Sequence, residues 1–127
     1  MNTKSKIVIA AVAGAALGAT AIQTLHAQAK LKAYSIGEVE VTGGLPPDYL
    51  AAVRKAIEAN HGRSLRTVNG RVVFIRGAPA PKNLAIVEWD SVDDAVAFYN
   101  SKAWTDGASV REKAEKEIRR YVVEVEK

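Results

Sequence analysis

Cysteine is absent from this chain of 127 residues, and its absence excludes several kinds of chemistry. A protein without thiols has no cysteine nucleophile, no disulfide and no zinc ribbon. Histidine is scarce as well, since only His26 and His61 are present. The sequence also lacks a glycine-rich phosphate loop, a nucleophile elbow and an aromatic RNA-binding signature. We therefore expect a protein that works with no metal and no organic cofactor.

The chain has a small excess of positive charge. The chain has 18 Lys and Arg residues against 14 Asp and Glu residues, which gives a net charge of +4. Two of these cations, Lys4 and Lys6, lie close to the N-terminus, and without them the net charge is +2. So small a positive balance is weak support for nucleic-acid binding. We expect no nucleic-acid partner.

Residues 1–29 have the three-part layout of a secretory signal peptide. The two lysines precede an uncharged apolar run from Ile7 to Ile22, and Ala27-Gln28-Ala29 follows it. The run has only 16 residues, fewer than the roughly 20 that span a bilayer. We predict cleavage after Ala29, only a transient contact with the membrane, and export to the periplasm or the medium. An uncleaved membrane anchor is the alternative.

The remaining segment, residues 30–127, has 98 residues and is expected to form a single domain. Apolar and β-branched runs predict strands at 31–41, 84–89 and 121–125. Helical spacing of apolar residues predicts helices from Pro47 to a left-handed cap at Gly62, at 92–99 behind a Ser91 cap, and at 102–117. Asn69-Gly70 predicts a tight hairpin turn within 63–76. This order is the split βαβ pattern of a ferredoxin-like α+β sandwich, an antiparallel sheet with helices on one face.

The strand predicted at 84–89 is apolar on both faces, apart from Glu88. Helices of so small a domain can cover only one face of the sheet. An apolar open face needs a partner, and a second copy of the chain can supply it. We therefore expect a homodimer that forms through the open sheet face.

Several stretches resemble the domain-of-unknown-function family 1330, a group of small dimeric α+β barrel proteins. They are AYSIGEVEV at 33–41, the helix that begins DYL at Asp48, NHGRSLRTVNG at 60–70, LAIVEWDSVDDAVAFYNSKAW at 84–104, and Val110-Arg111. The resemblance covers about residues 32–126 and implies a ferredoxin-like fold and a dimer whose sheets face each other. It implies no established activity. The sequence departs from the family at Arg63, where His-Gly-Gly is common, and at Lys102, where Ser-Pro often starts the last helix.

His61 is the only imidazole outside the signal segment, so one chain cannot build a metal site from two or three histidines. Beside Gly62 at a helix end, it could act as a general acid or base near neutral pH. Its favoured interpretation is structural, as a cation near the last helix carbonyls. Three aspartates, Asp90, Asp93 and Asp94, are likewise better explained as helix N-terminal charges than as a metal site.

The candidate ligand pocket lies between sheet and helices and comprises Tyr34, Glu88, Trp89, Tyr99, Trp104 and Arg111. The aromatic members could hold a ligand, although core and dimer packing is their favoured role. A carboxylate on an apolar strand needs a partner, and Arg76 and Arg111 are candidates for pairing with Glu88. The arginines at 63, 66, 71 and 76 indicate a solvated sheet edge, with anion binding as the alternative.

The favoured function is a small exported homodimeric domain, of unknown biochemical activity, that binds a small apolar or aromatic ligand in this pocket. The alternative is a cofactor-free monooxygenase-like or isomerase-like enzyme of the dimeric α+β barrel type. In that enzyme His61 would be the base, and Tyr34, Trp89 and Tyr99 would hold an aromatic substrate. The sequence does not decide whether the protein is an enzyme.

Overall fold

The computed structural model describes residues 31–67 and 70–127. The predicted signal peptide and its cleavage site therefore lie outside the described residues, as does Asn69 of the predicted hairpin turn. Within the described part of the chain, no helix combines the length and the apolar character needed to cross a membrane.

Four antiparallel strands form one sheet in the order β2-β3-β1-β4. Strand β1 (Lys32–Val41) is central and pairs with β3 (Asn83–Trp89) on one side and β4 (Glu115–Val125) on the other. The short strand β2 (Gly62–Leu65) lies at the far edge of β3. The run at 84–89 is thus an inner strand, as its two apolar faces predict.

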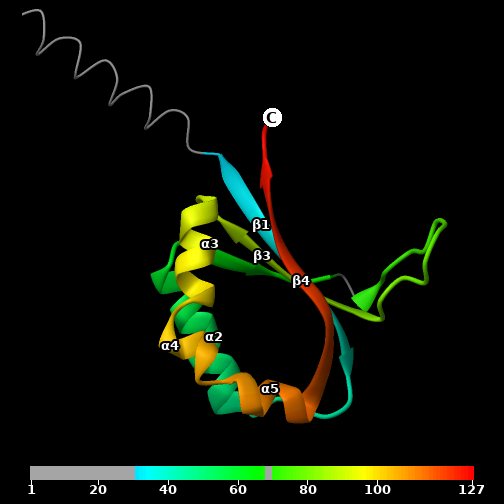
Figure 1. Ribbon diagram of the computed structural model, residues 1–127, viewed down its shortest axis with the longest axis horizontal. Coiled ribbons are helices and arrows are strands. Elements are labelled where there is room, and N and C mark those ends of the chain that lie inside the picture. The colour runs from blue at the N-terminus through cyan, green and yellow to red at the C-terminus, as the bar shows by residue number, and fades with distance from the viewer. Residues whose placement is uncertain (1–30, 68–69) are drawn as a thin grey trace, which may run out of the picture. The chain divides into compact units, whose positions relative to one another are not determined.

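The helices of the described residues lie on one face of this sheet (Figure 1). They are α2 (Pro47–Ala59), α3 (Val92–Tyr99), α4 (Lys102–Thr105) and α5 (Ala108–Ala114). Strand order and helix placement together confirm the predicted ferredoxin-like α+β fold.

Side chains alternate between the two faces of the sheet. On the helix-covered face, Ala33 lies opposite Trp89 and Ser35 lies between Val87 and Val122. On the other face, which we call the open face, the apolar side chains are Tyr34, Ile36, Leu84, Ile86, Tyr121 and Val123. The sheet therefore presents apolar side chains in both directions.

The core lies between the helices and the sheet and centres on Trp89 and Phe98. Their rings are 5.2 Å apart between centroids, and both side chains are fully buried. The Trp89 indole Nε1 donates a hydrogen bond of 2.9 Å to the hydroxyl of Ser35, which also accepts one of 2.8 Å from Tyr99. A buried indole needs such an acceptor, so Ser35 allows the large ring to occupy the core.

Helix α2 begins at Pro47, where a missing backbone N–H is harmless, and Asp48 complements the helix dipole in the first turn. It ends at the cap residue Asn60, and His61 then takes the left-handed conformation with φ 60°. The prediction that Gly62 is the left-handed cap was wrong. Gly62 opens β2 instead, and a Cβ there would lie 2.6 Å from the Trp89 ring, so the position needs glycine for close packing.

The hairpin predicted within 63–76 is only half present. Strand β2 ends at Leu65 and pairs with β3, whereas residues 71–76 form no strand. Residues 70–82 extend away from the helices as a long loop (Figure 1). Val73, Phe74 and Ile75 in this loop are 59%, 53% and 83% exposed. The β-prone run is therefore solvent-facing in the single chain.

The helix predicted at 102–117 is also shorter in the structure than its apolar spacing indicates. Asp106 and Gly107 separate α4 from α5, and the ring of Tyr49 lies where a side chain at Gly107 would project. Helix α5 ends at Ala114, and β4 starts at Glu115, six residues before the predicted 121. The charged residues at the start of β4 favour a helix. Pairing of β4 with β1 over its whole length, from Val41 to Lys32, outweighs this preference.

Candidate functional site

An open cavity of about 200 Å³ lies between α2 and the helix-covered face of the sheet. We call it the helix-side cavity. Its wall is mostly apolar: Leu50, Val53 and Ile57 come from α2, Val87 from β3, and Phe98 and Trp104 from the later helices. Its charged residues are Arg111, Glu115 and Arg120, which come from α5 and β4. The cavity thus combines an apolar body with a few charged groups from one part of the fold.

Arg111 is held against Trp104. Its guanidinium carbon is 3.5 Å from the centroid of the indole, and its Nη1 donates to the Trp104 carbonyl at 2.7 Å. The same nitrogen donates to the hydroxyl of Tyr49 at 2.8 Å. These contacts join three elements, α2, α4 and α5, and they fix the guanidinium at the wall of the cavity.

Arg120 approaches the same indole from β4, with its guanidinium carbon 4.8 Å from the ring centroid. Its side chain is only 14% exposed, and its Nε donates to Glu117 at 2.5 Å. Gly37 faces it on β1, and any side chain at Gly37 would collide with the guanidinium. The glycine therefore makes room for a nearly buried cation beneath the helices.

Glu115 is half-buried at the start of β4, and it lines the cavity. Burial raises the pKa of its carboxyl, and the charge of Glu117 raises it further, while Arg120 and Arg111 lower it. The net shift is upward. Its negative charge is accordingly held less firmly than that of a solvated glutamate.

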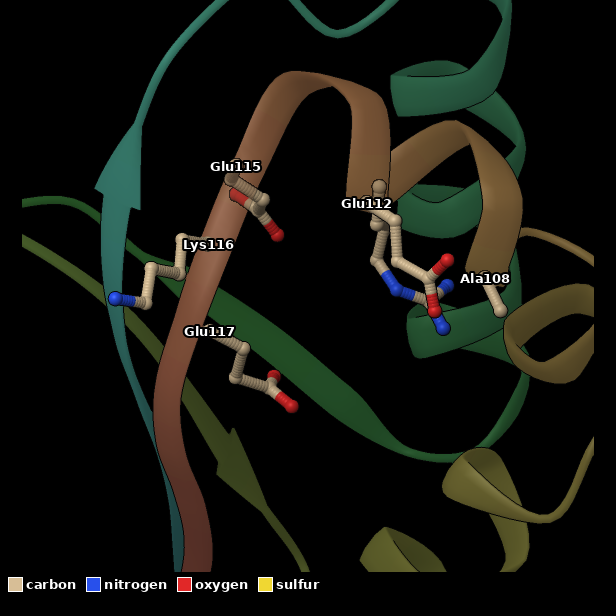
Figure 2. Close-up of a pocket in the computed structure, with 6 residues that line it drawn as sticks. Ala108, Glu112, Glu115, Lys116 and Glu117 are labelled. Atoms are coloured by element: carbon tan, nitrogen blue, oxygen red, sulfur yellow. The ribbon is translucent and has the colours of Figure 1, made fainter.

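A second, polar hollow of about 390 Å³ adjoins this end and shares Arg111 and Glu115 with the cavity. Figure 2 shows Glu115 and Glu117 projecting from β4 toward the side of Glu112, with Lys116 directed to the opposite side. Within residues 31–67 and 70–127, no group of three or more His, Asp or Glu side chains is arranged to hold a metal ion.

Glu88 lies on the open face, on the other side of the sheet from the cavity. It accepts hydrogen bonds from Lys32 at 2.8 Å, Tyr34 at 3.0 Å and Arg63 at 3.0 Å. These three donors, Lys32 first, lower the pKa of Glu88 from 4.5 to about 2. The candidate partners Arg76 and Arg111 are not involved, because Arg111 lies across the sheet and Arg76 lies in the loop after β2. Glu88 therefore forms an ion-pair network with Lys32 and Arg63, and the predicted pairing with Arg76 or Arg111 was wrong.

His61 lies outside the helix-side cavity. Its side chain is 66% exposed, and its Nδ1 is 3.2 Å from a carboxylate oxygen of Asp94. Asp94 in turn belongs to the cap of α3, where Ser91 accepts from its backbone N–H at 3.2 Å. Asp93 and Asp94 both occupy the first turn of α3, which confirms their interpretation as helix N-terminal charges. Asp90 precedes the Ser91 cap and pairs with Arg63, so for Asp90 this interpretation was wrong.

The six residues of the predicted pocket fall into three places. Trp104 and Arg111 meet at the helix-side cavity. Trp89 and Tyr99 lie behind it, packed in the core with Ser35. Tyr34 and Glu88 face away on the open face. The structure therefore brings two of the six together at a cavity.

The sequence pattern did not predict Arg120 and Glu115 as cavity residues. The helix predicted at 102–117 included Glu115, and Arg120 fell between it and the strand predicted at 121–125, whereas the helix ends at Ala114. Arg120 stands two residues before Val122, which faces the helices in an alternating strand. Extending that alternation backward from 121 would have placed Arg120 on the helix-covered face.

The strand order, the helix layer and the cavity define a small ferredoxin-like α+β domain. Residues 32–125 match the model of the family described as Domain of unknown function (DUF1330), and the chain belongs to this family. A crystal structure of a protein of unknown function from Rhodopseudomonas palustris is similar in fold, with a TM-score of 0.53 at 12% sequence identity. That similarity covers 76% of this chain and 82% of the other. No curated protein matches this chain.

Proposed function

We propose that the protein is an exported homodimer that binds a small apolar or aromatic molecule in the helix-side cavity. The composition of the cavity wall supports binding. The wall is apolar where α2 and β3 form it, and its charged residues come only from α5 and β4. Ligand sites commonly combine such an apolar body with a few polar groups that fix orientation.

The size of the cavity limits its ligand. Its volume of about 200 Å³ is below the range of roughly 300–1,000 Å³ that is typical for drug-sized ligands. Trp104 and Phe98 offer aromatic surface there, with their ring centroids 5.6 Å apart. A single ring with a short side chain fits these limits better than a nucleotide or a peptide does.

The open face supports the homodimer. Tyr121, Val123 and Leu65 are 40%, 41% and 45% exposed on or beside it. Polar groups border this apolar surface, with the Glu88 network at one end and the Glu38–Arg119 ion pair at the other. An apolar centre with a polar rim is the usual anatomy of a protein interface.

The occupant that fits this face best is a second copy of the chain. Two identical apolar faces can cover each other about a twofold axis, with Glu88 and Arg63 at the rim of each. Arg63, which departs from the family pattern, also bonds Asp90 at 2.8 Å and so stabilises this rim. The exposed loop residues Val73, Phe74 and Ile75 add apolar surface that a partner can cover.

Export rests on the signal-like segment at residues 1–29. Expression of the full chain with its native N-terminus, followed by mass spectrometry of the recovered protein, tests it. Recovery outside the cytoplasm with Lys30 as the first residue supports export and cleavage. A cytoplasmic protein that retains Met1 overturns both.

Ligand binding is tested with 3-phenylpropan-1-ol, a neutral aromatic probe, in the protein recovered after expression of the full chain. Trp104 lines the cavity and Trp89 is fully buried in the core, so the indole emission reports occupancy. Val53→Phe should fill the cavity and weaken binding at least tenfold. Ala52→Phe is the matched control, since Ala52 is exposed on α2 and lies outside the wall. Absence of saturable binding, or equal binding by both variants, overturns the proposal.

The enzyme alternative with His61 as base gains no support from this geometry. An imidazole that is 66% exposed and lies outside the wall cannot reach a molecule inside the cavity without a rearrangement. General bases act within hydrogen-bonding reach of the proton that they remove. We therefore assign binding to the site and no catalytic role to His61.

A further inference from the structure

We propose that the ligand of the helix-side cavity carries a carboxylate group, which the guanidinium of Arg111 binds, with Arg120 close beside it. This inference rests on the proposed function and specifies its ligand as a small aromatic or aliphatic monocarboxylate. The apolar part of the molecule would lie against Leu50, Val53 and Phe98.

The first support is the unused hydrogen-bonding capacity of Arg111. A guanidinium has five N–H donors, and the two on Nη1 are engaged by Tyr49 and by the Trp104 carbonyl. Nε and Nη2 donate no hydrogen bond within the described residues. No buried side-chain nitrogen or oxygen among these residues lacks a partner, so Nε and Nη2 of Arg111 retain access to solvent. Arg111 lines both the cavity and the adjoining hollow.

These two nitrogens form the edge of a guanidinium that suits a carboxylate. Nε–H and Nη2–H are parallel and match the two oxygens of the anion in a bidentate arrangement. The bonds of Nη1 hold the guanidinium in place before a ligand arrives. A pre-positioned fork loses little side-chain entropy on binding, which favours affinity.

The second support is charge. No carboxylate among the described residues lies within ion-pair distance of Arg111, and Glu115 influences it only at longer range. Arg120 has its own partner in Glu117, yet it shares the Trp104 indole with Arg111. Two like charges on one ring repel each other. An anion between the apolar wall and Arg111 relieves that repulsion.

The carboxylates of the adjoining polar hollow lead to a competing expectation, namely a cationic ligand. Glu112, Glu115 and Glu117 line it and would favour a cationic ligand. Burial weakens the charge of Glu115, and Glu117 is already paired with Arg120. Arg111 and Glu115 are thus the charged cavity residues that make no ion pair within the described residues, and the fixed guanidinium of Arg111 is the one that offers N–H donors. Matched acid, alcohol and amine probes separate these expectations.

The test compares 3-phenylpropanoate, 3-phenylpropan-1-ol and 3-phenylpropylamine by calorimetric titration of the protein recovered after expression of the full chain. We expect the acid to bind at least tenfold more tightly than the alcohol, and the amine to bind most weakly. Equal affinities of acid and alcohol, or a preference for the amine, overturn the carboxylate inference and leave the proposed apolar site standing. Failure of all three probes to bind overturns both proposals.

Substitutions test whether Arg111 causes the preference for the acid. Arg111→Met should lower acid affinity at least tenfold while alcohol affinity stays within threefold. Arg54→Met removes a cation from the exposed side of α2 and is the matched control, for which we expect no change. Arg111→Lys keeps the charge but loses the fork and should give an intermediate affinity. Acid affinity that survives in a folded Arg111→Met overturns the assignment, and the comparison of probes in the unaltered protein stands if that variant does not fold.

Discussion

The guanidinium carbon of Arg111 lies 3.5 Å from the centroid of the Trp104 ring, although the two residues belong to different helices. Gly107 lies beside this contact, close to Arg111 and Tyr49. It ends the segment that carries Trp104, and its bare backbone lets the ring of Tyr49 approach while Arg111 bonds the Tyr49 hydroxyl. Tyr49 from α2, Trp104 from α4 and Arg111 from α5 meet beside this glycine.

Gly107→Ala should destabilise the protein. The new Cβ would lie 3.0 Å from Nη1 of Arg111 and 3.1 Å from the Tyr49 hydroxyl, and it would collide with the Tyr49 ring. Overpacking of this kind costs about 1–3 kcal/mol of the free energy of unfolding. Urea denaturation measures the effect. Gly44→Ala is the control, because a Cβ at Gly44 meets nothing within 4 Å, and equal stability of both variants would contradict the packing role of Gly107.

Glu88→Gln should flatten the acid limb of the stability curve. The pKa of Glu88 falls from 4.5 to about 2 in the folded protein, mainly through the hydrogen bond from Lys32 and also through those from Tyr34 and Arg63. The unfolded chain therefore binds more protons at this site between those values, and the free energy of unfolding decreases as the pH falls through that window.

Measurement of unfolding at fixed protein concentration across this pH range checks the Glu88 prediction. The unaltered protein should have the steeper loss of stability. Glu124→Gln is the matched control, since Glu124 is exposed on β4 and makes no ion pair within the described residues. A slope that Glu88→Gln leaves unchanged would show that the network does not hold the Glu88 charge.

His61 should tolerate glycine better than alanine. At φ 60° it occupies the left-handed region, which costs a residue with a Cβ about 1 kcal/mol relative to glycine. Its exposed pair with Asp94 is worth roughly 0–1 kcal/mol. His61→Gly loses the pair but relieves the strain, so its melting temperature should match that of the unaltered protein, whereas His61→Ala should melt lower.

Thermal unfolding monitored by circular dichroism ranks these His61 variants by melting temperature. His61→Val should melt lowest, because a β-branched residue is least suited to positive φ. Binding of 3-phenylpropan-1-ol should be unchanged in His61→Gly, since His61 lies outside the cavity wall. A loss of binding without a loss of stability would instead restore a functional role for this histidine.

The fold could be predicted from sequence because its inner strands carry strong local patterns. The runs at β1 and β3 are apolar and β-branched, and Pro47 and Ser91 mark the starts of two helices. The last third of the domain was harder to predict, because Val110, Ala114 and Ile118 recur at a helical spacing that continues past the end of the helix at Ala114. Only pairing with β1 decides that Glu115 begins a strand.

The candidate site could be predicted only in part, for a related reason. Whether a strand residue faces the helices depends on the order and register of the strands, which no local pattern fixes. Tyr34 and Trp89 both lie on inner strands, yet they point to opposite faces. Arg111 and Trp104 were found because they lie in the helical segment that closes over the sheet.

Whether the open face binds a second copy is measured most directly by sedimentation velocity at micromolar concentration. Val123→Glu places a charge on the open face, and Val96→Glu is its matched control on α3, since the two valines are 41% and 48% exposed. The unaltered protein and Val96→Glu should sediment as dimers, and Val123→Glu as a monomer. A monomeric unaltered protein, or a Val123→Glu dimer as stable as the Val96→Glu dimer, would contradict pairing through this face.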